Sequence, residues 1–226
     1  GGSNWKGVFG QDNSSSGHLK NQNVSEDDLF LFYGWYRKTK IENGCLIYDK
    51  SDLSGRHIIF GYLQIGKIII EQNKDEIKKL DWVYSRTHPH PHLNVKLWTN
   101  KYRNGKLWRK ANNILYIARD ILSWNSDYAG WGVFKFDKKL ILTETDILKN
   151  PPNKYGKQNR SYWKKYRFPY GMKISYHPNR SCWFGDDGEE LPYFKTKSPG
   201  QEYVISNHKD LEKSSYQYAD LVLELS

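Results

Sequence analysis

The strongest constraint on the fold comes from two aromatic and β-branched runs separated by a polar segment. Residues 29–36 (LFLFYGWY) and 57–70 (HIIFGYLQIGKIII) are rich in residue types that favour strands, and Gly61 and Gly66 interrupt the second run. Glycine inside a strand is typical of a bulge or a sharp bend. We therefore expect an α+β fold with a curled, mainly antiparallel sheet or small barrel and a few peripheral helices.

The remaining segments predict shorter elements around this sheet. Further strands are expected at 113–119, 131–136, 139–143, 172–176 and 203–205. Asp137 and Lys138 are expected to form the turn of a hairpin between strands 131–136 and 139–143. The polar segment 38–56 contains Asn43-Gly44 and predicts a hairpin-type connection. Helices are expected at 74–82 and near the C-terminus, and residues 4–27 are expected to be rich in loop. One domain over residues 1–226 is predicted, with residues 1–3 as a linker.

Length and composition indicate a folded protein without a membrane span. The chain has 226 residues, of which 38% are hydrophobic and 15% aromatic, enough to bury a substantial core. No apolar run is long enough to cross a bilayer, so we expect a soluble, cytoplasmic protein with no membrane partner. Cys45 and Cys182 are far apart and lack CxxC spacing, which argues against a disulfide framework or a thiolate zinc site. Composition leaves the oligomeric state open.

The positive charge is concentrated in two segments. The formal net charge is +10, and residues 82–119 and 147–185 contain no Asp or Glu but about half of the 35 Lys and Arg residues. Both segments interleave cations with Trp and Tyr, so cations can meet phosphates while rings stack on bases. The alternative is that the rings face inward and the cations are only solvated. We predict binding of double-stranded, modified DNA through Arg37, Lys101, Arg103, Lys106, Arg109, Lys110, Arg160, Lys164 and Lys165.

A histidine-rich loop is the main candidate for acid–base chemistry. His88, His90 and His92 alternate with prolines, and metal ligands can alternate in this way. Since no nearby Cys or carboxylate completes a ligand set, we expect no metal site and favour one His as an acid, base or hydrogen-bond donor. Phosphate-loop, dinucleotide and GxSxG motifs are absent, and the sequence leaves the identity of any cofactor open.

Several segments together resemble a known family. The sequences WKGVFGQ (5–11), GHLKNQ (17–22), DLFLFYGWYR (28–37), HIIFGYLQIG (57–66), HPH (88–90), NILYIA (113–118), SYH (175–177) and GQEYV (200–204) are similar in order and spacing to the bacterial and phage family called nucleotide modification associated domain 3. The resemblance covers nearly the whole chain. It implies an association with the modification of nucleobases in DNA, in phage or anti-phage settings. It also implies a further segment before Gly1 that carries an acidic residue and glycines.

The resemblance also implies candidate site residues, because polar positions inside the matching motifs suit chemistry on a base. Base chemistry needs a positioned acid or base and groups that read the Watson–Crick edge. The catalytic candidates are His18, Gln64, His90 and Glu202. The base-binding candidates are Asn21, Gln22, Trp35, Tyr36, His57 and His177. Each of these residues can alternatively be a buried scaffold or core residue.

Three functions are compatible with these features. The first is an enzyme that modifies or excises an everted base. The second is a non-catalytic reader of modified bases, since the two aromatic runs also resemble, in architecture, the small PUA-like barrels. The third is a free-nucleotide enzyme, whose basic segments would contact a single phosphate group.

Overall fold

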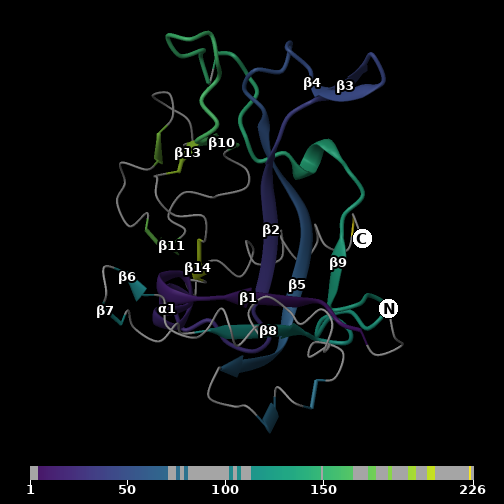
Figure 1. Cartoon of the computed structure of the whole chain (residues 1–226), viewed down its shortest axis with the longest axis vertical. Coiled ribbons are helices and arrows are strands. Elements are labelled where there is room, and N and C mark those ends of the chain that lie inside the picture. Colours follow the sequence, from purple (N-terminus) through teal and green to yellow (C-terminus); the bar gives the residue numbers. More distant parts are fainter. Residues whose placement is uncertain are drawn as a thin grey trace. The chain divides into compact units, whose positions relative to one another are not determined.

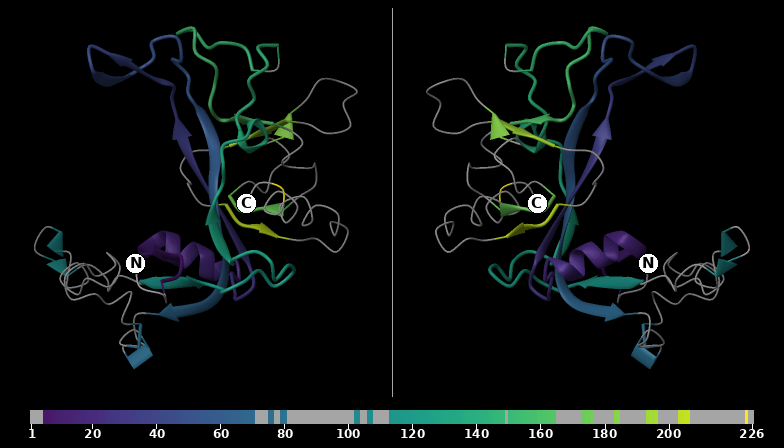
Figure 2. Two further views of the ribbon diagram at one scale, coloured as in Figure 1. Left: turned by 90° about the vertical axis from the view of Figure 1, so that its right-hand side faces the viewer. Right: turned by 90° about the vertical axis from the view of Figure 1, so that its left-hand side faces the viewer.

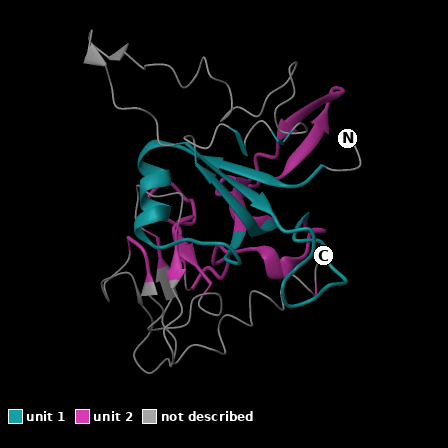
Figure 3. Ribbon diagram, turned by 90° about the horizontal axis from the view of Figure 1, so that it is seen from below, with its two compact units in different colours: residues 1–30, 62–132 teal, residues 31–61, 133–226 magenta. Residues whose placement is uncertain are grey.

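A five-stranded sheet is the main element of the computed structural model (Figure 1). The structure describes residues 5–70, 75–76, 79–80, 102–103, 106–107, 113–148, 150–164, 173–176, 183–184, 193–196, 203–206 and 224. They form two compact units, shown in teal and magenta in Figure 3: unit 1 is Gly1–Phe30 with Tyr62–Gly132, and unit 2 is Leu31–Gly61 with Val133–Ser226. The one-domain arrangement stays a prediction.

The sheet has the strand order β1-β8-β5-β2, and β9 also pairs with β5. Its strands are β1 (Val8–Gln11), β2 (Leu29–Tyr36), β5 (Arg56–Ile70), β8 (Ile114–Ala118) and β9 (Trp131–Val133). Its β1–β8 and β5–β8 pairs, whose registers are defined, are antiparallel. The expected α+β fold with a curled, mainly antiparallel sheet is confirmed, as are the strands predicted at 29–36, 57–70 and 113–119.

Unit 1 forms its core around β8. All five residues of β8 are buried, and Leu115 and Ile117 pack with Ile69 of β5 and with Val8 of β1. The register between β5 and β8 shifts between Ile65 and Lys67, as expected for a glycine at position 66. A Cβ atom at Gly66 would lie 2.8 Å from the backbone of Arg119, so only glycine fits at this bulge.

Unit 1 also contains a helix and a short strand pair. Helix α1 (Asn13–Asn21) buries Leu19, and a short strand pair joins β6 (Tyr102–Arg103) to β7 (Lys106–Leu107). Residues 4–27 thus contain β1 and α1. No helix in the described part of the chain is long and apolar enough to span a membrane.

Unit 2 contains a two-stranded ribbon and several short strand pairs. Strands β3 (Thr39–Glu42) and β4 (Cys45–Tyr48) form a separate hairpin inside segment 38–56, for which a long hairpin-type connection was predicted, and its turn residues Asn43 and Gly44 have the positive φ of a type I′ turn, 52° and 75°. Strand β13 (Tyr193–Lys195) pairs with β10 (Tyr162–Trp163) and β12 (Trp183–Phe184). The strands expected near 172–176 and 203–205 are found as β11 (Lys173–Ile174) and β14 (Ile205–Ser206), which pair with each other.

One predicted hairpin is wrong. Residues 138–140 form the 3-10 helix η2 (Lys138–Leu140), because the Asp137 carboxylate accepts a hydrogen bond from the Lys139 backbone N–H at 2.7 Å and starts a helical turn. After this turn, Ile141 and Thr143 form single bridges with Ile58 and Trp163. The strand predicted at 131–136 is found as β9, which ends at Val133. The helices predicted at 74–82 and near the C-terminus lie largely outside the described residues.

Candidate functional site

An arginine lies over an exposed tryptophan in unit 2. Trp35, near the end of β2, is 43% exposed, and its indole Nε1 donates a hydrogen bond to the Ser54 carbonyl at 3.1 Å. The Arg160 guanidinium carbon is 5.2 Å from the Trp35 ring centroid. Among the described residues, no carboxylate pairs with Arg160. We call Trp35 and Arg160 the Trp35–Arg160 pair.

The backbone beneath Trp35 requires a glycine. Gly55 has a φ of +62°, and a Cβ atom at this position would lie 2.5 Å from the Trp35 Nε1 and 2.7 Å from the Tyr36 carbonyl oxygen. The bond to Ser54 and this close approach hold the ring while much of its surface faces solvent. An immobilised, exposed ring is suited to stacking, because little side-chain entropy remains to be lost on binding.

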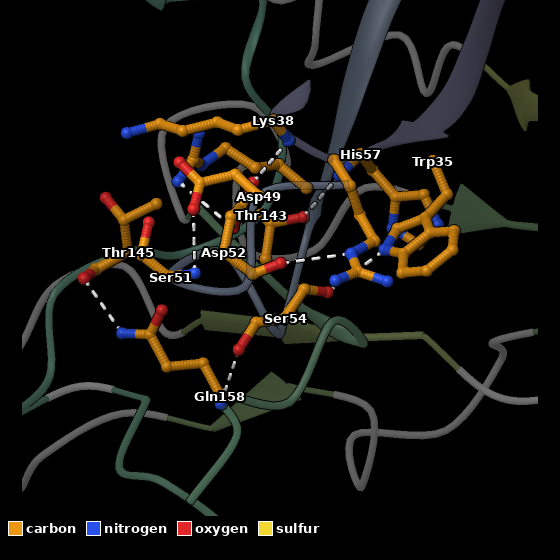
Figure 4. A network of polar contacts seen from close by, with 12 residues as sticks. Trp35, Lys38, Asp49, Ser51, Asp52, Ser54, His57, Thr143, Thr145 and Gln158 are labelled. Carbon is orange, nitrogen blue, oxygen red and sulfur yellow. Dashed lines mark hydrogen bonds and ion pairs between the residues drawn. The ribbon is translucent and has the colours of Figure 1, made fainter. Parts of the chain in front are cut away.

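A loop network connects the Trp35 segment to the basic segment (Figure 4). The Asp52 carboxylate, which is buried, accepts a hydrogen bond from the Lys38 backbone N–H at 2.7 Å. Two residues later, the Ser54 hydroxyl accepts the Gln158 backbone N–H at 3.0 Å, and the Gln158 amide donates to the Thr145 carbonyl at 3.0 Å. These bonds fix the segment that carries Arg160 beside the loop that holds Trp35.

His57 lies next to this pair, with its ring in contact with two other polar groups. Its Nδ1 atom is 3.2 Å from the Arg160 carbonyl oxygen and 3.3 Å from the Trp163 Nε1, and its backbone N–H donates to the Thr143 hydroxyl at 2.8 Å. Burial lowers the pKa of His57, while the Arg160 carbonyl opposes this and the Arg160 charge adds to it. Neutral His57 can accept from Trp163, whereas a proton on Nδ1 would be donated to the Arg160 carbonyl.

Two aromatic rings contact His57, and a third ring, that of Tyr203, packs against both of them. Tyr33 meets His57 at 5.6 Å and Trp163 at 5.2 Å in edge-to-face geometry, and Tyr203 stacks on Tyr33 at 6.4 Å. Trp163 is only 2% exposed. For this ring of the second basic segment, the inward-facing alternative is therefore the one observed.

The predicted catalytic residue Gln64 is fully bonded inside unit 1. Its amide nitrogen donates to the Asp27 carbonyl at 3.0 Å and to the Ser123 hydroxyl at 2.6 Å, and its amide oxygen accepts the Ser123 N–H at 2.8 Å. The residue is 1% exposed. This is the arrangement of a scaffold residue, and catalysis by Gln64 would require these bonds to be exchanged for bonds to a substrate.

The structure brings some of the predicted site residues together and separates others by unit. Unit 2 contains Trp35, Tyr36, Arg37, His57, Arg160 and Lys164, and unit 1 contains His18, Asn21, Gln22 and Gln64. His18 is half-buried in α1, Asn21 ends this helix and is exposed, and half-buried Gln22 follows it. Lys164 is linked to His57 through the backbone of Leu142, whose carbonyl accepts from the Lys164 N–H and whose N–H donates to the His57 carbonyl.

Two of the unit 2 candidates, Arg37 and Tyr36, contact other described residues. Arg37 donates from Nε to the Asp52 carbonyl at 3.0 Å and lies over the Tyr48 ring at 4.6 Å. Tyr36, 43% exposed, meets the ring of Phe60 edge to face. The remaining candidates are His90, His177, Glu202, Lys101, Arg109, Lys110 and Lys165, which lie outside the described residues, and Arg103 and Lys106, which are placed only as members of β6 and β7. A single pocket that contains all candidates stays a prediction.

The sequence interpretation missed several residues of this region. Tyr33, Ser54, Thr143 and Tyr203 were not assigned, although all four contact an assigned residue or its neighbours. A signal existed for Tyr33, because side chains two apart on a strand share a face and Trp35 follows two positions later. Ser54 and Thr143 bind residues that are distant in the sequence, and nothing in the local sequence indicates these partners.

The chain matches one family model. The model described as nucleotide modification associated domain 3 matches residues 2–206. No curated protein and no solved structure matches the chain. Within the described residues, no group of three His, Cys, Asp or Glu side chains is arranged to hold a metal ion.

Proposed function

The chain belongs to the family of nucleotide modification associated domain 3, and we propose that it acts on modified nucleobases in DNA. The proposed partner is a modified, double-stranded DNA, in a phage or anti-phage setting and a cytoplasmic location. The family membership supports a role linked to nucleotide modification. The further proposal that the chain binds DNA rests on the Trp35–Arg160 pair.

The Trp35–Arg160 pair supports binding of a nucleotide rather than a purely structural function. A base can stack on an exposed indole, and the Arg160 guanidinium, which has no carboxylate partner among the described residues, can bind a phosphate in a bidentate geometry. Arg160 lies in the acid-free segment 147–185, so no Asp or Glu of that segment competes for it. Ser54 holds the Trp35 indole through its carbonyl and the Gln158 backbone, two residues before Arg160, through its hydroxyl, and these bonds exist before any ligand binds.

An enzyme that modifies or excises an everted base is the first form of this proposal. The residue after the predicted catalytic Glu202 is Tyr203, which packs on Tyr33 and Trp163 beside His57. Tyr203 thus belongs to the His57 cluster, formed by His57, Tyr33, Trp163 and Tyr203. In this form Glu202 and His90 are the acid–base candidates, His18 and Gln64 complete the catalytic set, and His177, Asn21 and Gln22 read the base.

A reader of modified bases is the second form, and one observation favours it. The polar side-chain atoms of Gln64 are bonded within the protein, as is the Nδ1 of His57. One catalytic candidate, Gln64, and one base-binding candidate, His57, are thus engaged as scaffold, while 43% of the Trp35 surface is exposed. A protein that only binds a nucleobase needs an exposed ring for stacking. It does not need a free side chain for acid–base catalysis.

The deciding experiment follows the fate of the base. The protein is incubated with matched duplexes that contain either modified or unmodified bases, and the products are digested to nucleosides and analysed by mass spectrometry. A changed base or an abasic site on the modified duplex supports the enzyme. Unaltered DNA together with modification-dependent binding supports the reader.

Two results would contradict the proposal as a whole. One is a binding constant that does not change with salt concentration, because contacts to several phosphates release counterions. The other is turnover of free nucleotides only, which would support the free-nucleotide enzyme. Arg160→Ala and Trp35→Ala serve as variants with a disrupted site in each assay.

A further inference from the structure

The β3–β4 ribbon has one uncharged face. Because side chains alternate along a strand, Thr39 and Ile41 of β3 lie on the same face as Leu46 and Tyr48 of β4, and Ile41 is directly opposite Leu46 in the register. The Ile41–Leu46 pair is the second cross-strand pair from the two-residue turn. Side chains at such a pair approach each other closely. The charged side chains Lys40 and Glu42 form an ion pair at 3.3 Å on the other face. The uncharged face is called the ribbon face below.

The ribbon face exposes large apolar side chains. Ile41 is 76% exposed, Leu46 72% and Tyr48 59%. In Figures 1 and 2 the ribbon extends away from the end of β2, where Trp35 and Tyr36 are located. Because Ile41, Leu46 and Tyr48 are clustered on one face at the end of a narrow arm, we treat the ribbon face as a contact surface for another molecule.

The base of the ribbon face is cationic and belongs to the region proposed to bind DNA. Arg37 lies over the Tyr48 ring at 4.6 Å, and the β4–β5 connection carries Ser54, which holds both Trp35 and the segment before Arg160. Along the ribbon face, the apolar Ile41–Leu46 pair is thus followed by the Tyr48 ring and then by Arg37. Proteins that kink duplex DNA combine an apolar wedge with arginines beside it in this manner.

The size of the ribbon face favours DNA over a protein partner. A stable protein–protein interface buries about 800 Å² per partner and involves about 20–30 residues. The ribbon face offers Thr39, Ile41, Leu46 and Tyr48. A step between two base pairs, in contrast, is filled by one or two apolar side chains.

We propose that Ile41 and Leu46 form a wedge that enters the base stack of bound DNA. This inference rests on the proposed function, since the wedge would occupy the stack while a base is moved out toward the Trp35–Arg160 pair. Insertion separates neighbouring bases, and the flanking cations bind the adjacent phosphates. The wedge therefore acts on DNA conformation and is distinct from any residue that performs chemistry.

The test measures base unstacking and affinity in parallel. A duplex that contains 2-aminopurine beside a modified base is titrated with wild type, with Ile41→Thr/Leu46→Thr and with the control Val133→Ala. Threonine retains strand propensity but removes most of the apolar surface. Val133, which is 77% exposed, tests the loss of an exposed apolar side chain elsewhere in unit 2.

We expect wild type and the Val133 control to raise 2-aminopurine fluorescence several-fold, and the double threonine variant to lose most of this rise. The salt dependence of binding should stay the same in all three proteins. Restoring bulk with Ile41→Leu/Leu46→Met should restore the fluorescence. Thermal melting should be unchanged within a few degrees in every variant, because both side chains are exposed.

Three outcomes would overturn the inference. If wild type shows no salt-dependent binding, the proposed function fails and the wedge fails with it. If wild type binds but the double threonine variant unstacks the DNA equally well, only the wedge is wrong. If sedimentation shows that wild type self-associates and the double threonine variant does not, the ribbon face is an interface between two copies of the chain.

Discussion

The guanidinium of Arg160 lies 5.2 Å from the centroid of the exposed Trp35 ring, and Trp35 is itself held by a hydrogen bond to the Ser54 carbonyl. A cation–π contact of this kind leaves the donor groups of the guanidinium available to a phosphate. The same two side chains can thus present a flat ring and a positive charge to one nucleotide. The proposed function depends on this relationship.

Removing the charge at Arg160 should weaken DNA binding and its salt dependence together. Arg160→Ala is expected to reduce the slope of log K against log salt by about one, the value for one lost phosphate contact. Arg160→Lys should retain much of the slope but lose affinity, because an ammonium cannot bind a phosphate in the bidentate geometry. Fluorescence anisotropy at several salt concentrations measures both. An unchanged slope in Arg160→Ala would place Arg160 away from the phosphates.

A methyl group at Gly55 should displace Trp35. Gly55→Ala combines a φ of +62° with an approach of 2.5 Å to the indole nitrogen, so we expect unfolding to be easier by more than about 1 kcal/mol and DNA binding to weaken. Gly44→Ala is the matched control, because Gly44 has a φ of +75° but open space around it. Its cost should be about 1 kcal/mol with no loss of binding. Urea denaturation and anisotropy compare the two; equal binding losses would count against a role for the Trp35 position.

Replacing Gln64 should destabilise unit 1. In Gln64→Ala the Asp27 carbonyl and the Ser123 N–H lose buried hydrogen-bond partners, and we expect the free energy of unfolding to fall by about 2 to 4 kcal/mol. Gln158→Ala removes a single exposed bond to Thr145 and should cost less than about 1 kcal/mol. Chemical denaturation gives both values. A variant of Gln64 that melts like wild type but has lost turnover would instead support its predicted catalytic role.

His57 should make stability depend on pH. Its pKa in the folded protein lies below the ordinary value of 6.5, because burial disfavours the charged ring. Between these two pKa values the unfolded chain binds more protons, so the free energy of unfolding falls as the pH decreases from about 6.5 through the lowered pKa of the folded state. His57→Gln should flatten this part of the curve. Denaturation series between about pH 5 and 7.5 measure it, and an NMR titration of the His57 ring checks the direction of the shift.

Local chemistry predicted the main strands well. The runs at 29–36 and 57–70 became β2 and β5 because dense aromatic and β-branched side chains favour strands wherever they pack. Gly66 marks the register shift because a Cβ atom there would collide with the Arg119 backbone, and Asn43-Gly44 forms the tight turn because these residue types tolerate a positive φ. The 139–143 strand failed for an equally local reason, the competition of the Asp137 cap with an extended backbone.

The sequence by itself determined the strand-forming segments, the glycine positions and the uneven distribution of charge. Only the tertiary structure decided which rings face inward and which polar groups are already bonded. Trp163 meets the imidazole of His57 across 106 residues of chain, and Gln64 is bonded to Ser123 across 59. Such pairings depend on sheet register and burial, which are set by the whole chain, so no local pattern distinguishes a buried Trp163 from an exposed Trp35.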